Sequence, residues 1–105
     1  MYLDSEEELN KHLNACQGYL HLDMPDEAIE ELSLVPTCFY ESADYLQFKA
    51  WALMKKQDWR TALKYTTKLC TQYPELPVPF LDAAYCMHEM QNTQKARAIL
   101  LEGPP

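Results

Sequence analysis

A spacing of 34 residues recurs along this chain and constrains its fold more than any other feature. Ala28, Ala62 and Ala96 stand at this spacing, which is the length of a helix–turn–helix repeat. Other columns keep the same register: His12, Leu46 and Phe80; Cys16, Ala50 and Ala84; Tyr19, Leu53 and Met87; Leu32, Thr66 and Leu100. Repeats of this kind bury their apolar faces against their neighbours and expose an extended surface. The period therefore favours binding over catalysis.

Capping residues and prolines locate the expected helices. Ser42 and Asp58 can each cap a helix that begins at the next residue, and Pro25 and Pro77 suit the first turn of a helix. Ser5 followed by Glu8 has the spacing of a capping box. Together these signals predict six helices, at about residues 6–22, 25–34, 43–57, 59–73, 77–91 and 92–102.

The columns resemble the pattern of the tetratricopeptide repeat family. The best match is the second repeat, through Leu46, Ala50, Leu53, Ala62, Leu69 and Pro74. The resemblance implies an all-α fold, namely a right-handed α-solenoid of three antiparallel helix–turn–helix repeats with about six helices. It implies a single domain over residues 1–105, with repeats at about 9–42, 43–76 and 77–105. Pro36 precedes its expected position, so the second helix should be short and an irregular connection should follow it over residues 36–40.

The charge of the chain is acidic and uneven. Its formal net charge is −7, which argues against nucleic acid as a partner because phosphates require a basic surface. Basic side chains gather in the middle of the chain, at Lys49, Lys55, Lys56, Arg60, Lys64 and Lys68. This basic segment is either a solvated outer face or a contact for an acidic part of a partner.

Two further sequence properties concern location and cysteine chemistry. The chain contains no apolar run long enough to span a membrane and no secretory signal at its start, so we expect a cytoplasmic protein without membrane contact. Cys16, Cys38, Cys70 and Cys86 have no C-x-x-C spacing. They are expected to be small core residues rather than a disulfide framework.

Catalysis and metal binding find little support in the sequence. His12 and Cys16 could face one ion, but both occupy packing columns and no third ligand is close in sequence. Cys86 and His88 are two residues apart and diverge on a helix, so they cannot form a local nucleophile–base pair. We therefore expect no enzyme activity, no catalytic residue, no metal and no cofactor.

The resemblance also implies a concave groove lined by the first helices of the repeats. The groove positions carried over to this chain include Leu13, Gln17, Leu20, His21, Gln47, Trp51, Met54, Lys55, Leu81, Tyr85 and His88. Trp51 and Tyr85 share a column, so they should project next to each other as partly exposed aromatic anchors. Some relatives clamp a terminal carboxylate with cationic side chains. The matching positions here hold no cation: Leu13, Gln17, Phe48, Val78 and Asp82.

These observations predict a non-enzymatic protein–protein interaction module that binds an apolar or amphipathic peptide or helix of a partner protein, with a chaperone-like role as its narrower version. The alternative is a self-associating assembly module or a fragment of a longer repeat array. No polar capping helix follows the last repeat, so Ile99, Leu100 and Leu101 form a candidate self-association edge of a homodimer.

Overall fold

The computed structural model describes residues 3–103, with the side chains of residues 3–5 and 93–96 outside the description. Every regular element in this part is helical, which confirms the predicted all-α fold. The elements are α1 (Leu3–His21), α2 (Pro25–Leu32), the short 3₁₀ helix η1 (Thr37–Phe39), α3 (Ala43–Lys55), α4 (Trp59–Gln72), α5 (Pro77–Glu89) and α6 (Thr93–Glu102).

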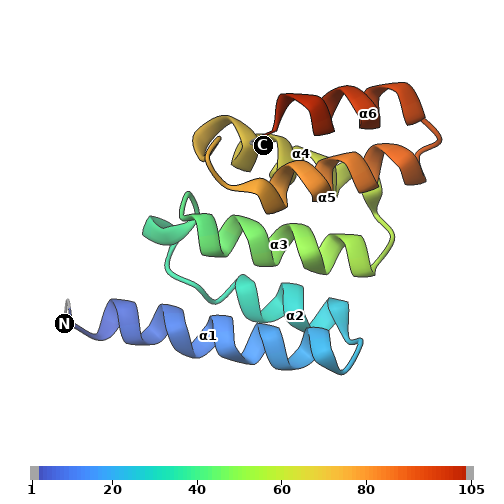
Figure 1. Cartoon of the computed structure of the whole chain (residues 1–105). Helices are drawn as coiled ribbons and strands as arrows, with labels where there is room; N and C mark the ends of the chain where they lie inside the picture. Colours follow the sequence, from blue (N-terminus) through green and yellow to red (C-terminus); the bar gives the residue numbers. More distant parts are fainter. Residues whose placement is uncertain (1–2, 104–105) are drawn as a thin grey trace.

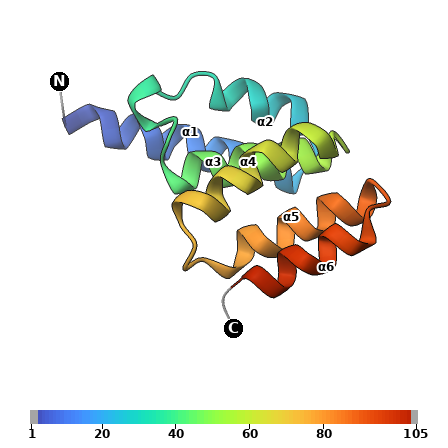
Figure 2. The same ribbon diagram turned by 90° about the horizontal axis from the view of Figure 1, so that it is seen from above.

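The helices form three hairpins that stack along one direction (Figures 1 and 2). Within the hairpins, α1 packs on α2, α3 on α4 and α5 on α6, while α2 packs on α3 and α4 on α5 between them. Helix α3 also packs on α1, whereas α5 packs chiefly on α4 and α6. The stack is elongated, with principal extents of 47 × 27 × 18 Å.

The turn inside each hairpin has the same conformation. Asp23, Gln57 and Gln91 stand 34 residues apart and have φ values of 58°, 64° and 63°. The amide of the residue after each of them donates to a carbonyl five residues back, for example Asp58 N to Leu53 O at 2.9 Å. This left-handed closure satisfies carbonyls that the end of a helix leaves without partners. The 34-residue period is therefore present in the backbone as well as in the side chains.

The helix starts agree with most of the capping signals. The side chain of Ser42 accepts from Tyr45 N at 3.2 Å at the start of α3, and that of Asp58 accepts from Thr61 N at 3.4 Å at the start of α4. The prediction from Ser5 is wrong, because α1 begins at Leu3 and Ser5 lies inside it. Helix α2 ends at Leu32, and η1 lies in the predicted irregular connection.

Small residues occupy the helix crossings, as the columns predicted. Cys16, Ala28, Ala50 and Ala62 have 0% exposure and Ala84 has 5%. The side chain of Ala96 lies outside the described ones. One core cluster joins the first two hairpins through Leu32, Leu46 and Leu69, among others. A second cluster, made of Leu53, Ala62 and Cys86, joins α3, α4 and α5.

Part of the basic segment pairs with acids that precede α3 in the chain. Lys56 lies 2.8 Å from Asp26, and Lys68 lies 2.6 Å from Glu41. Hydrogen bonds from Lys68 and Gln72 hold the pKa of Glu41 below its ordinary value. Because both pairs are exposed to solvent, they contribute little to stability. These two lysines have partners within the chain.

Candidate functional site

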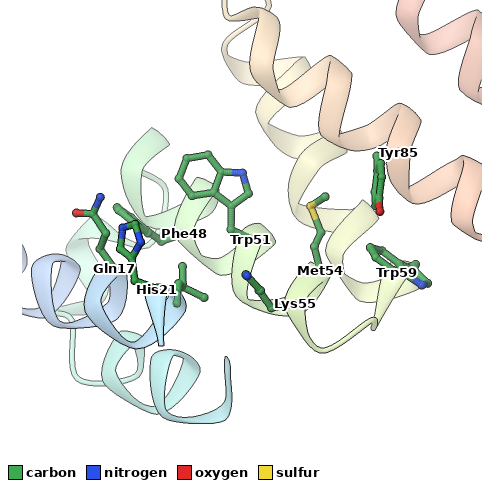
Figure 3. Close-up of a pocket in the computed structure, with 9 residues that line it drawn as sticks. Gln17, His21, Phe48, Trp51, Met54, Lys55, Trp59 and Tyr85 are labelled. Carbon is green, nitrogen blue, oxygen red and sulfur yellow. The ribbon is translucent and has the colours of Figure 1, made fainter. Parts of the chain in front are cut away.

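A cavity of about 590 Å³ opens between the hairpins on the side of α3. Four helices supply its walls: α1, α3, the first residue of α4, and α5 (Figure 3). Its size is typical of cavities that bind a ligand or a few side chains of a partner. The lining residues are Gln17, Leu20, His21, Phe48, Trp51, Met54, Lys55, Trp59 and Tyr85.

The aromatic side chains of the cavity form two separate edge-to-face pairs. The ring centroids of Phe48 and Trp51 are 5.6 Å apart with an interplanar angle of 89°, and those of Trp59 and Tyr85 are 5.5 Å apart at 63°. Trp51 is 37% exposed and Tyr85 is 49% exposed. The expectation that these two rings project side by side is corrected: each pairs with another ring, and they lie apart in Figure 3.

Asp82 of α5 fixes the position of Trp51. Its Oδ2 accepts hydrogen bonds from Trp51 Nε1 at 2.9 Å and from Gln47 Nε2 at 2.8 Å. These bonds connect α3 to α5 directly, across the opening that holds the cavity. Burial raises the pKa of the Asp82 carboxyl, and the two hydrogen bonds act in the opposite direction. The indole of Trp51 is thus held by a charged acceptor, while much of its face remains open to the cavity.

Asparagine at position 82 is expected to preserve the fold better than alanine. The Asp82→Ala change leaves two partly buried donors without their acceptor and should cost about 1 kcal/mol, whereas Asp82→Asn keeps a carbonyl oxygen. Because burial raises the pKa of Asp82 in the folded chain, ionisation there costs stability, and this cost grows as the pH rises through the carboxyl range. Asp82→Asn should therefore gain stability relative to the native chain between about pH 3 and pH 7. Urea unfolding of the native chain and of Asp82→Asn at about pH 3 and pH 7 measures the difference in stability. If the variant loses stability relative to the native chain as the pH rises, the prediction is contradicted.

Seven of the groove residues predicted from the sequence lie together at this cavity: Gln17, Leu20, His21, Trp51, Met54, Lys55 and Tyr85. Four others lie elsewhere. Leu13 is 6% exposed and belongs to the core cluster of the first two hairpins, so it is closed to a partner. Gln47 is bound to Asp82, and the exposed residues Leu81 and His88 lie outside the lining.

Two lining residues were missing from the predicted groove, Phe48 and Trp59. Phe48 follows Gln47 on α3 and matches only a clamp position of the family pattern. Trp59 is the first residue of a second helix, a class of position that the family pattern does not assign to the groove. A sequence signal did exist for both, because each is a large aromatic residue within a few positions of Trp51 or the α3–α4 turn.

The remaining candidate residues take on separate roles. Leu100 and Leu101 are 47% and 79% exposed on α6, and Ile99 is half-buried. His12 is buried and pairs with the carboxylate of Glu31 on α2. Burial raises the pKa of Cys16 and of Cys86 to about 11, which keeps both thiols protonated near neutral pH.

Two further properties of the described residues concern membranes and metals. None of the helices in this part of the chain is both long and apolar enough to cross a membrane. Groups of three or more His, Cys, Asp or Glu side chains that could hold a metal ion are likewise absent from the described residues.

Comparison with known proteins places the central hairpin in a family. A family model described as tetratricopeptide repeat matches residues 49–75, which lie inside the second predicted repeat and cover the end of α3 and all of α4. No curated protein and no solved structure matches the chain. Repeats of this family generally serve protein–protein interaction. The match over residues 49–75, together with the stack of helical hairpins, supports a relationship of this chain to the tetratricopeptide repeat family.

Proposed function

We propose that this chain is a non-enzymatic interaction module that binds an apolar or amphipathic segment of a partner protein in the cavity beside α3. The observation that carries the proposal is the aromatic lining. Phe48, Trp51, Trp59 and Tyr85 all face one opening, and two of these rings remain more than one-third exposed. Half-exposed aromatic side chains around a cavity supply much of the binding energy at protein interfaces.

The chemistry of the cavity favours an apolar side chain over a carboxylate terminus as the main anchor. Met54 extends the apolar wall between the two aromatic pairs (Figure 3), and Leu20 adds apolar surface on the α1 side. Of the positions that hold a carboxylate clamp in some relatives, Leu13 is buried and Asp82 is negatively charged and already accepts two hydrogen bonds. A helix or extended segment that inserts one or two large apolar residues fits this surface.

A double substitution tests the proposal. Trp51→Glu with Tyr85→Glu removes one ring from each aromatic pair and adds charge to the lining. We expect loss of partner capture from an extract of the native cells, and at least an about 30-fold weaker affinity for the captured partner's binding segment by calorimetry. Leu34→Glu, at an exposed leucine outside the lining, is the matched control. Equal capture by the folded double variant and the native chain would reject the cavity as the binding surface.

Self-association is the second candidate function. It is favoured by the exposure of Leu100 and Leu101 at the end of the described stack. Helix α6 packs chiefly on α5 there. A mass that rises with concentration in sedimentation, and that Leu101→Glu returns to the monomer value, would favour it. A monomer at all concentrations would reject it.

A further inference from the structure

The charge of the cavity lining differs from that of the whole chain. Asp and Glu outnumber Lys and Arg by 16 to 9 in the sequence, yet the nine lining residues contain Lys55 and His21 and no carboxylate. Both basic groups lie on the side formed by the end of α1 and the end of α3. An apolar cavity with a cation at one edge favours a ligand that has an apolar part and a negative group.

Lys55 is more available than the other paired lysines. Its Nζ lies 4.0 Å from Asp23 Oδ1, at the outer limit of an ion pair, and the Asp23 side chain is 80% exposed. By contrast, Lys56 lies 2.8 Å from Asp26. A loose pair between exposed side chains contributes little, so a carboxylate of a partner can replace Asp23 at small cost.

Two carboxylates of α5, Asp82 and Glu89, lie outside the lining but beside residues that line the cavity, and both already have donors. Asp82 accepts from Trp51 and Gln47. A hydrogen bond with Glu89 raises the pKa of the Tyr85 hydroxyl, which therefore remains protonated as a donor. The cavity is thus polarised, with positive charge toward α1 and α3 and negative charge toward α5. A bound segment with its own acidic group has one favourable orientation.

We propose that the occupant of the cavity is an acidic amphipathic segment of a partner protein, which inserts an apolar side chain between the aromatic pairs and places a carboxylate on Lys55. This inference rests on the proposed function and adds to it the charge of the partner. Lys55 then determines specificity and orientation, while the aromatic rings supply affinity.

Synthetic peptides test the inference directly. One dye-labelled amphipathic peptide carries Leu and Phe on its apolar face with flanking Glu residues, and its twins carry Gln or Lys in place of Glu. Fluorescence anisotropy with the native chain should give about fivefold tighter binding of the Glu peptide than of the Gln peptide, as one partly exposed ion pair would. This preference should shrink as salt is raised, because salt screens exposed charges.

Charge reversal on the protein supplies the second arm. Lys55→Glu should weaken the Glu peptide by more than fivefold and reverse the preference in favour of the Lys peptide. Lys56→Glu is the matched control, because Lys56 is the next residue, is exposed and lies outside the lining; the peptide preference should be unchanged there. Both variants are checked by circular dichroism.

The outcomes separate the two proposals. Equal binding of the three peptides, or a preference that Lys55→Glu leaves intact, overturns the acidic partner while the apolar cavity stands. If none of the peptides binds, both proposals fail. If the chain dimerises and the peptide dissociates the dimer, the native occupant is a second copy, which also overturns the inference.

Discussion

Replacing Leu69 by alanine is expected to lower the free energy of unfolding by about 2–5 kcal/mol, the cost of an unfilled cavity in a close-packed core. Leu69 is 0% exposed on α4 and packs in the cluster that joins the first two hairpins. Small domains have total stabilities of about 5–15 kcal/mol. The loss is therefore a large part of the total, and the melting temperature should fall by at least about 10 °C.

Chemical and thermal unfolding of Leu69→Ala measure this effect. Leu22→Ala is the matched control, because Leu22 is 69% exposed just after α1 and the same atoms are removed there. We expect the control to differ from the native chain by no more than about 0.5 kcal/mol. A similar small effect at Leu69 would mean that α4 does not pack on the first hairpins as described, and would contradict the stacked arrangement.

The buried columns could be predicted because packing imposes them. Where two helices cross closely, a side chain larger than Ala or Cys collides with the opposing backbone, so the spacing of Ala28 and Ala62 carries information about the fold. The hairpin turns could not be predicted in the same way. Left-handed residues at helix ends are usually Gly or Asn, but this chain uses Asp23, Gln57 and Gln91. These residues are not the usual markers of a helix end, so the recurrence becomes visible only in the backbone conformation.

The cavity was only partly predictable, for a related reason. Helical spacing tells which residues share a face, but it does not tell how far neighbouring helices separate. Helix α5 packs chiefly on α4, so the opening beside α3 reaches Trp59 at the start of α4. Leu13, on the other hand, is covered in the core of the first hairpins. These differences depend on the angles between hairpins, which result from the whole core rather than from any one column.

Ala62 belongs to the 34-residue pattern and packs against two helices that line the cavity, α3 and α5. The residue is 0% exposed on α4 and packs with Leu53 of α3 and Cys86 of α5. Tyr85, which lines the cavity, immediately precedes Cys86. A side chain larger than a methyl group at position 62 must therefore move α5 away from α4, and the Trp59–Tyr85 pair spans these two helices.

Ala62→Phe is accordingly expected to destabilise the chain by about 3 kcal/mol or more, the upper range for overpacking a core. Ala98→Phe is the control, since Ala98 is exposed on α6 and experiences the same change in helix propensity. Unfolding in urea measures the stability of both variants. Near-ultraviolet circular dichroism reports the aromatic pairs, and its spectrum should change for Ala62→Phe alone. If position 62 accepts phenylalanine as readily as position 98 does, the small-residue column is not a packing requirement, and the 34-residue period loses its physical explanation.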